Sequence, residues 1–511
     1  MPPLQVPEWS RSLEWVPLAA PELAMTLLIC AIFVADLFTA RENKARLGVA
    51  SLVGVVLVAL LALLSWGQAP RSTFGGLLLV DNFAVFMKLV VLLGTGLSIL
   101  ISLHYLKVER INLGEFYGLL LSSALGMMIM AAGGDLITIY LGLELMSISI
   151  YILVGFIRHD ELSREAALKY FLMGAFTSGV LLYGMALVYG LTGYTDLRSI
   201  AGALAAGRPR GLLENPALIL GLIMMVAGFG FKIALVPFHM WVPDAYTGAP
   251  TSVTAFMSVG TKAAAFAGLM RIFLVALEAL GPKWNLLLWS LAAFTMLWGN
   301  IAAIVQSNLK RMLAYSSIAH AGYALMGLVA SLREDGTFSS TGMSAVLFYL
   351  VVYTFTNVGA FAMVILLCRE GFRGDRIEDF QALGRTSPWA ALIFVVFFLS
   401  LAGLPPTAGF VGKLYLFAAA IEQRYVWLAV IGVVGSAIGI YYYFRVVMVM
   451  YMYEPKGPAP ILQNSPSLLA ALFLMVALTF ALAIFPGAFI DAARDSVTIF
   501  LPPARTAALP F

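Results

Sequence analysis

The sequence predicts an all-α polytopic membrane protein with about fourteen transmembrane helices. Of the 511 residues, 61% are hydrophobic and only 11% are charged, and the mean hydropathy is +0.93. A soluble domain usually carries about 25% charged residues, and a membrane-spanning helix needs about 20 apolar residues. Two of the apolar segments are interrupted by proline, which predicts broken helices. The chain is therefore expected to form one membrane domain without a sizeable soluble domain.

Polar breaks divide the chain into fourteen apolar segments. They lie at 18–40, 47–66, 77–103, 115–132, 135–157, 168–192, 217–247, 251–279, 285–305, 312–331, 344–368, 388–422, 425–453 and 467–490. The seventh is interrupted at Pro237 and Pro243, and the twelfth between Gly403 and Pro406. Proline removes a backbone donor and clashes with the preceding turn, so both helices should break there. Broken backbone inside a bilayer must face protein or water, because lipid offers it no hydrogen bonds.

Basic residues gather on one side of the predicted membrane domain. The loops after spans one, three, five, nine and eleven hold most of them: Arg41, Lys44, Arg46, Lys107, Arg110, Arg158, Arg164, Lys169, Lys310, Arg311, Arg369, Arg373, Arg376 and Arg385. The positive-inside rule places these loops in the cytoplasm and both termini outside. Arg198, Arg208 and Arg210 lie on the opposite side and weaken this assignment. The N-terminus lacks the basic region that precedes a cleaved signal sequence, so we expect the first span to be retained.

The two broken segments are five spans apart, which predicts two five-helix repeats of opposite orientation. An odd number of spans inverts a repeat across the membrane, and broken helices at corresponding positions of inverted repeats mark ion paths in transporters. The predicted organisation is a three-helix segment at 1–114, a first repeat at 115–279, a second, inverted repeat at 285–453, and a C-terminal helix and tail at 454–511.

The sequence disfavours several classes of function. The net charge is only +4 and lies mostly in loops, which provides no surface for nucleic acid. Cys30 and Cys368 lie in apolar segments without a neighbouring metal-binding pattern, so neither zinc nor an iron–sulfur cluster is expected. The sequence contains no GxxxxGK[ST] phosphate-binding loop and no pair of histidines at haem-like spacing. The energy for any ion movement must then come from a partner.

Four ionisable residues lie deep inside apolar segments. Glu144 is at the middle of the fifth span, and Lys232 precedes the break at Pro237 by five residues. Lys262 lies near the middle of the eighth span, and Lys413 lies just beyond the second break. A lysine in hydrocarbon costs roughly 3 kcal/mol on insertion scales, and intramembrane acids and bases mostly mark ion or proton paths. Each could instead be a structural residue neutralised by a neighbouring helix. Burial disfavours a charged lysine and a nearby carboxylate favours it, so such a pair can load and unload a proton.

Two histidines are candidates for a proton relay. His320 lies early in the tenth span, and His239 follows the first break. Imidazole titrates near pH 6.5 and can pass protons in either direction. Either histidine could equally be a hydrogen-bonded tie between helices, so the relay is an interpretation to be tested against the geometry.

The other acidic and basic residues near span ends are interpreted as structural. Asp244, at the end of the first break, is expected to cap a helix or anchor a loop. Asp36, Asp81 and Lys88 lie toward the ends of the first and third spans, and are expected to face the membrane interface or a neighbouring subunit.

Five motifs carry a resemblance to a known family. They are GDLITIYLGLELMS, FKIALVPFHMWVPDAYTGAPTSV, SVGTKAAAFAGLMRIF, NLKRMLAYSSIAHAGYALMG and LSLAGLPPTAGFVGKLYLF. With these motifs the chain resembles the antiporter-like membrane subunits of the proton-pumping NADH–quinone oxidoreductases (respiratory complex I and its NDH-1 relatives), within the wider Mrp-type antiporter family. The resemblance covers roughly residues 20–490, and the run that begins PFHMW is its most specific part.

The resemblance implies a fold and a role for each buried charge. It implies fourteen helices, two inverted five-helix repeats, broken helices seven and twelve, and a central hydrophilic axis. It implies that Glu144 is the glutamate of the fifth span and Lys232 the lysine paired with it. Lys262 would be the central lysine of the eighth span, and Lys413 the exit residue of the twelfth. A lysine at that last position, and a single span beyond the second repeat, favour the subunit N group over subunits M and L.

The resemblance also implies where the remaining chemistry lies. The chain is expected to be a non-redox subunit of a proton-translocating NADH:quinone oxidoreductase, and to bind no cofactor or metal itself. NADH, FMN, iron–sulfur clusters and quinone are expected in partner subunits. The expected neighbours are the antiporter-like subunit M, the small membrane subunits and the lipid of a bacterial plasma membrane, with no nucleic acid.

Three functions are compatible with the sequence. The first is proton translocation along the Glu, Lys and His axis, driven by quinone reduction in another subunit. The second is a Mrp-type cation/proton antiporter subunit without a redox partner, which the neighbouring genes would distinguish. The third is a scaffold whose charges only tie helices together, and it predicts that Glu144→Gln and Lys232→Met reduce assembly rather than turnover.

Overall fold

The computed structural model describes residues 15–109, 111, 113–207, 211–333, 336–368, 372–454, 462 and 465–501. In this part of the chain, thirteen helices are long and apolar enough to cross a membrane. The twelfth predicted span is present as two shorter helices on either side of its break. The predicted class, a polytopic helical membrane protein with about fourteen spans, is thereby confirmed. Four basic residues used to orient the chain lie outside the described residues: Arg110, Arg208, Arg210 and Arg369.

The described elements are twenty α-helices, one short β-hairpin and a few single turns of other helix types. The α-helices are α1 (Trp15–Leu18), α2 (Ala20–Phe38), α3 (Ala45–Leu63), α4 (Asn82–Val108), α5 (Glu115–Ala132), α6 (Leu136–Val154), α7 (Glu161–Thr192), α8 (Leu197–Gly207), α9 (Pro216–Ile233), α10 (Val242–Gly248), α11 (Thr251–Arg271), α12 (Gly281–Ile304), α13 (Leu309–Val329), α14 (Ser340–Leu367), α15 (Leu383–Thr386), α16 (Pro388–Ala402), α17 (Ala408–Glu422), α18 (Val426–Met452), α19 (Pro466–Ile484) and α20 (Gly487–Val497). The hairpin pairs β1 (Arg71–Thr73) with β2 (Leu78–Val80) in antiparallel register, with Ser72 opposite Leu79.

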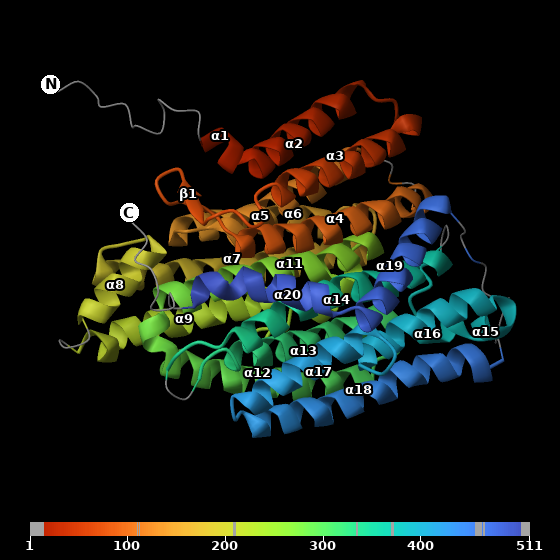
Figure 1. Cartoon of the computed structure of the whole chain (residues 1–511). Helices are drawn as coiled ribbons and strands as arrows, with labels where there is room; N and C mark the ends of the chain where they lie inside the picture. Colours follow the sequence, from red (N-terminus) through yellow and green to blue (C-terminus); the bar gives the residue numbers. More distant parts are fainter. Residues whose placement is uncertain are drawn as a thin grey trace.

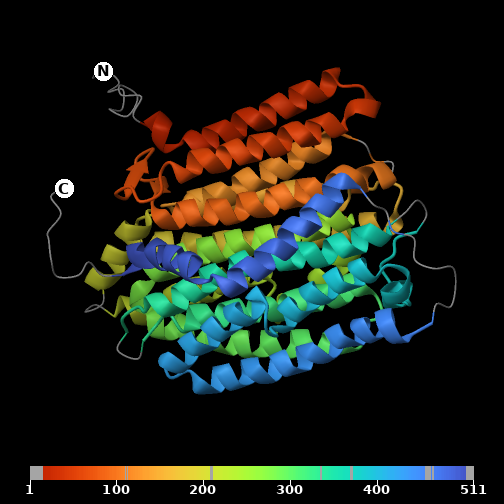
Figure 2. The same ribbon diagram turned by 45° about the vertical axis from the view of Figure 1, so that its right-hand side comes forward.

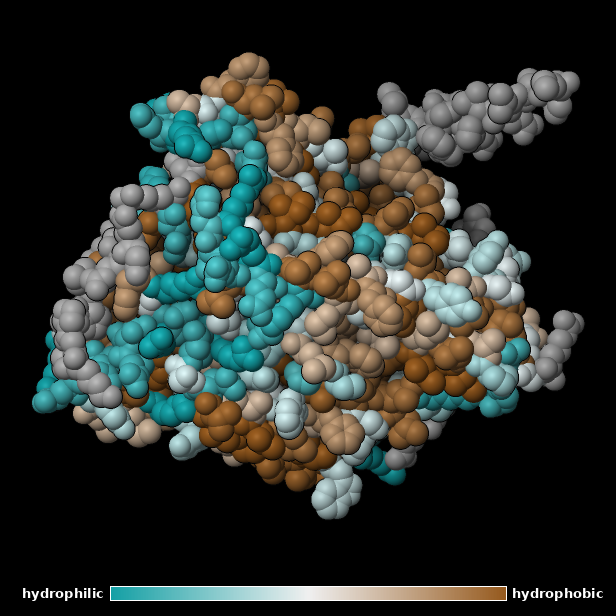
Figure 3. Space-filling view, turned by 180° about the vertical axis from the view of Figure 1, so that it is seen from behind, coloured by the Kyte–Doolittle hydropathy of each residue, from teal (hydrophilic) through white to brown (hydrophobic). Residues whose placement is uncertain are grey.

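The long helices lie side by side, roughly in the order of the chain. Figure 1 shows α2 and α3 at one edge of the bundle and α18 at the other, and Figure 2 shows the same order after rotation. The chain then returns, so that α19 and α20 pack against α4 and α14. In Figure 3, hydrophilic residues gather at one end of the helices, while a wide hydrophobic surface covers the middle. This distribution fits a protein that spans a bilayer.

Three helices form the centre of the bundle. Every residue of α11 is buried, and α13 and α14 are buried along almost their whole length. Asn357 of α14 donates from Nδ2 to Ser258 Oγ of α11 at 2.6 Å, which ties the two helices together inside the membrane region. Polar side chains in these helices therefore face protein rather than lipid, as intramembrane polar groups usually do.

Both predicted breaks are present, and they have the same form. The seventh span is divided into α9 and α10, and the twelfth into α16 and α17. Each first half ends on a residue with left-handed backbone, Ala234 at φ 69° and Gly403 at φ 79°. Glycine at the second break also leaves room for the Lys413 side chain, because a Cβ on Gly403 would lie 2.5 Å from Cδ of Lys413. The two breaks confirm the prediction made from the prolines.

The first two helices of each repeat pack in the same way. In the first repeat, α5 meets α6 where a Cβ on Gly126 would lie 2.5 Å from Met146 N. In the second, α12 meets α13 where a Cβ on Gly299 would lie 2.6 Å from Ala319 N. Small residues allow such close backbone approach between helices in a membrane. The correspondence supports the reading of the two halves as repeats.

The prediction for Asp81 and Lys88 is wrong, because both side chains are buried in ion pairs inside the chain. Asp81 forms a bidentate pair with Arg271, and Lys88 Nζ lies 2.5 Å from Glu22 Oε1. Burial alone would raise the pKa of the Asp81 carboxyl, but the charge and hydrogen bonds of Arg271 outweigh it and hold that pKa below its usual value. Asp36 pairs with Lys44 near the end of α2.

Candidate functional site

Lys232 lies in the last turn of α9 and points toward α6. Its Nζ donates to Ser147 Oγ at 2.7 Å and to Tyr151 Oη at 3.2 Å. Glu144 lies on the same side of α6, three residues before Ser147, because residues spaced by three and four share a helix face. Glu144 is within electrostatic range of Lys232, but among the described residues the two form no ion pair and Glu144 Oε1 has no hydrogen-bond partner. The two residues are therefore linked by charge alone, while the hydroxyl groups of Ser147 and Tyr151 hold the Lys232 ammonium.

Glu144 has room for a further partner. Its Oε1 atom is buried and has no hydrogen-bond partner within the described ranges. The residue is only half buried, since it lies on a face of α6 where Leu141 and Ile148 are 60% and 53% exposed. A carboxylate in the middle of an apolar membrane face is costly unless another group covers it.

Lys262 lies at the centre of α11 and contacts α13. Its ammonium group donates to both the backbone carbonyl and the Oγ of Ser317. Ser317 Oγ is also 3.4 Å from Tyr246 Oη, and Tyr246 belongs to α10 just after the first break. The eighth-span lysine is thus joined by hydrogen bonds to α10 and α13.

His320 lies on α13, one turn beyond Ser317, and is enclosed by tyrosines. Its Nδ1 is hydrogen-bonded to Tyr349 Oη of α14, and its Nε2 lies 3.2 Å from Tyr443 Oη of α18. Tyr443 Oη is in turn hydrogen-bonded to Ser316 Oγ. The imidazole is within electrostatic range of the lysines on both sides, Lys262 and Lys413. Both lysines thus act on the same imidazole, which is compatible with the predicted relay.

Lys413 begins on α17 and reaches back over the second break. Its Nζ donates to the carbonyl of Ala402 at 2.9 Å and to Ser436 Oγ at 2.9 Å. Ala402 is the last residue of α16, and the end of a helix carries partial negative charge on its free carbonyls. Lys232 differs, because it belongs to the last turn of α9 itself and its ammonium group donates to hydroxyl groups of α6. Each break therefore has a lysine beside it, but only Lys413 contacts the free carbonyls of a half-helix.

His239 and Asp244 lie away from this line. His239 Nε2 accepts a hydrogen bond from Trp298 Nε1 at 2.9 Å on the outer side of α12, and no contact among the described residues joins it to the axis. Asp244 accepts hydrogen bonds from Lys169 and Arg311, so it fastens α10 to α7 and α13 as the sequence predicted for a loop anchor.

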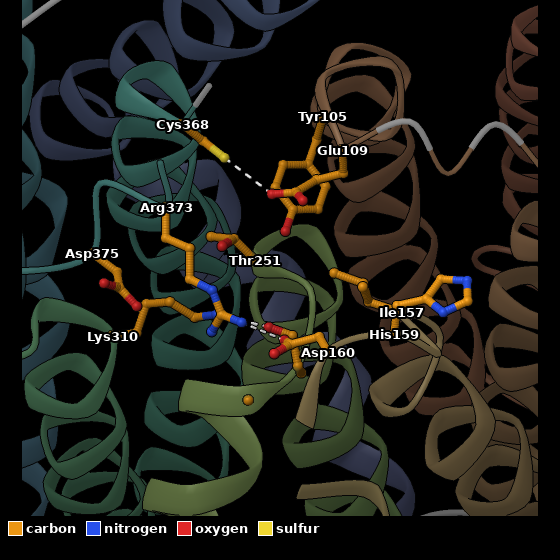
Figure 4. Close-up of a pocket in the computed structure, with 12 residues that line it drawn as sticks. Tyr105, Glu109, Ile157, His159, Asp160, Thr251, Lys310, Cys368, Arg373 and Asp375 are labelled. Atoms are coloured by element: carbon orange, nitrogen blue, oxygen red, sulfur yellow. Dashed lines mark hydrogen bonds and ion pairs between the residues drawn. The ribbon is translucent and has the colours of Figure 1, made fainter. Parts of the chain in front are cut away.

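A polar cavity of about 250 Å³ lies at the end of the bundle that carries the basic loops. It is lined by Tyr105, Glu109, Ile157, His159, Asp160, Gly248, Ala249, Thr251, Lys310, Cys368, Arg373 and Asp375. Figure 4 shows Arg373 and Asp160 pointing toward one another as an ion pair, and Cys368 pointing toward Glu109. Burial and the Glu109 carboxylate raise the pKa of the Cys368 thiol, so it stays protonated and donates.

The cavity adjoins the inner line of charges. Lys310 of α13 donates from Nζ to the carbonyl of Ala249 at 2.7 Å, at the junction of α10 and α11. Tyr246, three residues before Ala249, contacts Ser317, which receives the hydrogen bonds of Lys262. A short stretch of α10 therefore separates the cavity from the central lysine.

Sequence reasoning identified the charged members of the line but missed the hydroxyl groups between them. Glu144, Lys232, Lys262, His320 and Lys413 come from five different helices, and all of them except the half-buried Glu144 are buried. The missed residues are Ser147, Tyr151, Ser316, Ser317, Tyr349, Ser436 and Tyr443. Two signals in the sequence could have identified some of them. Ser147 and Tyr151 follow Glu144 by three and seven residues, which places them on the same helix face, and the serine pair Ser316 and Ser317 precedes His320 by about one turn.

Sequence comparisons identify a family and close relatives. Residues 133–439 match the transmembrane family of NADH:quinone oxidoreductase and Mrp antiporter subunits. A NADH-quinone oxidoreductase subunit N of Trichlorobacter lovleyi is 48% identical over 84% of this chain and 86% of its own length. A subunit N 1 of Solibacter usitatus is 43% identical over 93% of this chain and 96% of its own.

Structural comparisons agree with the sequence comparisons. A chain of the respiratory complex I of Thermus thermophilus, solved with bound aureothin, superposes with a TM-score of 0.77 at 34% identity, over 93% of this chain and 99% of that one. A chain of the Mrp complex of a Dietzia species superposes with a TM-score of 0.79 at 21% identity, over 96% and 98% of the two chains. The second likeness concerns the fold alone.

Proposed function

Because the chain belongs to the NADH:quinone oxidoreductase/Mrp antiporter family of membrane subunits, we propose that it translocates protons as the N-type subunit of an NADH–quinone oxidoreductase. The observation that carries this proposal is the set of buried titratable groups Lys232, Lys262, His320 and Lys413, with the half-buried Glu144 on the helix that Lys232 contacts. A structural protein has no need of so many buried titratable groups, since each costs free energy in a membrane.

The line can move protons without any redox group of its own. An approaching negative charge favours the protonated form of a buried lysine, and its withdrawal favours release. A change at Glu144 would act on Lys232 through Ser147 and Tyr151, which contact the Lys232 ammonium directly. Loading of Lys262 would then proceed through Ser317, and His320 would pass the proton toward Lys413. Electron transfer and its cofactors, NADH, FMN, iron–sulfur clusters and quinone, would belong to partner subunits.

The exposed side of α6 is the expected site at which a partner acts on Glu144. Ile137, Leu141, Ile148 and Ile152 are exposed on the same helix face as Glu144. A neighbouring membrane subunit that covered this face would remove an apolar surface from lipid contact and could place a polar or charged group against the carboxylate. The antiporter-like subunit M and the small membrane subunits are the candidate neighbours. We also propose the domain division 1–114, 115–279, 285–453 and 454–511, because the two helix breaks and the two close helix pairs recur at corresponding positions.

Glu144→Gln tests whether this carboxylate carries charge or only ties helices. We expect the assembled complex to form in normal amounts and its proton pumping per NADH oxidised to fall several-fold, because glutamine keeps the shape but cannot change charge. Pumping is measured in proteoliposomes with a pH-sensitive dye, and assembly on native gels. A loss of assembly with normal pumping in what remains would favour the scaffold function instead.

The cavity in Figure 4 is the proposed entrance for protons from the cytoplasmic side. Lys310→Met should slow pumping several-fold, because it removes a buried cation that lies between the cavity and the Tyr246–Ser317 contact. Lys283→Met is the matched control, since Lys283 pairs with the exposed Glu214 away from the cavity. Equal pumping rates in the two variants would contradict an entrance at this cavity.

A Mrp-type cation/proton antiporter subunit is the second candidate function. The likeness to the Mrp complex chain favours it only at the level of the fold. The two functions differ in their partners, so affinity purification of the tagged chain from native membranes separates them. We expect quinone-oxidoreductase subunits to co-purify, whereas a set of antiporter subunits alone would support the second function.

A further inference from the structure

A second polar cluster lies beside the Lys413 end of the axis, where α12, α13 and α18 meet. Asn300 of α12 is at its centre and is only 1% exposed. Its Nδ2 donates to the carbonyl of Met296 at 2.7 Å and to Tyr323 Oη at 3.1 Å. Its Oδ1 accepts a hydrogen bond from Tyr442 Oη at 3.1 Å. One carboxamide therefore joins α13 to α18.

Helix α18 is shaped to receive this carboxamide. A Cβ on Gly435 would lie 3.0 Å from Asn300 Nδ2 and 3.1 Å from Tyr323 Oη, and a Cβ on Gly439 would lie 3.2 Å from Asn300 Oδ1. Glycine at both positions lets the backbone of α18 approach α12 closely, as small residues do between membrane helices. The niche and the three hydrogen bonds together hold the carboxamide in one orientation.

Tyr323 connects this cluster to the axis. The Lys413 ammonium lies 4.8 Å from the centroid of the Tyr323 ring, which is the geometry of a cation–π contact. The same ring lies edge-on to His320, with centroids 5.8 Å apart. The hydroxyl group of Tyr323 is held by Asn300 and also contacts Ser436, the serine that accepts from Lys413, so the position of the ring that faces Lys413 depends in part on Asn300.

At its other end the cluster reaches the cytoplasmic end of α12. Tyr442 lies one turn before Arg445 on α18, and the Arg445 guanidinium donates to the carbonyls of Ile304 and Gln306. A cation at the end of a helix interacts favourably with its free carbonyl groups. The two helices are therefore fixed to each other at this end and at Asn300.

We infer that Asn300 is a positioning residue for Lys413: it holds the Tyr323 ring against the Lys413 ammonium, and Tyr442 holds Asn300 in turn. This inference rests on the proposed proton translocation. The contact with an aromatic face stabilises the protonated lysine in a low-dielectric site. Asn300 thereby acts on the transferring group through another side chain, without touching it.

The inference is tested on the whole complex in proteoliposomes with four variants. Asn300→Leu removes the hold on the ring, Tyr323→Phe keeps the ring but loses its hydroxyl, and Tyr442→Phe loses the hydrogen bond to Asn300. We expect each to lower the rate of proton pumping per assembled complex, roughly threefold to tenfold for the first two. The Asn300→Leu/Tyr323→Phe double variant should pump no more slowly than either single variant, because both changes act on the same contact.

The control is Tyr441→Phe, which changes the preceding residue of α18. Tyr441 is 55% exposed whereas Tyr442 is 1% exposed, so this variant should pump at the normal rate. Normal pumping by assembled Asn300→Leu, or additive losses in the double variant, would overturn the inference. If the Asn300→Leu variant does not assemble, the Tyr442→Phe variant tests the inference, and normal pumping by that variant would overturn it. Lys413→Ala distinguishes failure of this inference from failure of the proposed function. Normal pumping by the Lys413→Ala variant would refute the proposed proton translocation itself.

Discussion

Lys262→Ala is expected to abolish proton pumping while the complex still assembles. Lys262 is the only charged residue in α11 before its last residue, and that helix is entirely buried. Its ammonium group is held by Ser317, whose Oγ retains a contact with Tyr246 when the lysine is removed. Loss of a buried charge also removes its desolvation cost, so the fold should tolerate the change. Acidification of proteoliposomes on addition of NADH and quinone measures the effect.

The controls for Lys262 address volume and charge separately. Lys262→Met keeps the length of the side chain without its charge, and should lose pumping as completely as the alanine variant. Lys283→Ala removes a lysine that pairs with Glu214 at the surface and should pump normally. The amount of assembled complex is read on native gels for all three. Full pumping by assembled Lys262→Met would show that this lysine does not carry the translocated charge.

The helices and their breaks could be predicted from the sequence because each depends on local signals. Length and apolarity locate the spans, and the prolines at 237 and 405–406 locate the breaks. The β1–β2 hairpin and the short helices α8 and α20 were missed, because strands of three residues and helices of eleven residues give only weak periodic signals.

The charged members of the site were also predictable, since a charge inside an apolar segment is conspicuous. The contacts that these residues make could not be predicted from the sequence. Lys232 donates to Ser147 and Tyr151 rather than to Glu144, and hydroxyl groups of this kind are too common in membrane helices to single out. The pairing of Asp81 with Arg271 joins residues 190 positions apart, and only the packing of α4 against α11 brings them together.

That buried pair is the basis of the largest expected effect on stability. Asp81 and Arg271 share two hydrogen bonds, of 2.8 and 2.9 Å, and both side chains are almost completely buried. Arg271 also donates from Nε to the carbonyl of Ala131 and lies over the ring of Phe83. The pair therefore holds the ends of three helices together, next to the π-helical turn Ile272–Ala276 that continues α11.

Removing one partner should prevent the chain from accumulating. Asp81→Asn keeps the shape of the side chain but leaves the guanidinium of Arg271 buried without a counter-charge, and Arg271→Met leaves the carboxylate alone; each change should cost about 3–5 kcal/mol. Chain abundance in membranes and the thermal unfolding midpoint of the purified complex measure the loss. Glu214→Gln, which breaks the exposed pair with Lys283, should change the free energy by less than about 1 kcal/mol.

The Asp81→Asn/Arg271→Met double variant decides what the ion pair contributes. A buried pair can often be replaced by uncharged side chains at little net cost, because the desolvation of both charges is removed along with their attraction. We therefore expect the double variant to recover much of the abundance lost by the two single variants. If the double variant were as poorly folded as the worse single variant, the hydrogen bond of Arg271 to Ala131 and its contact with Phe83 would account for the stability, rather than compensation of charge.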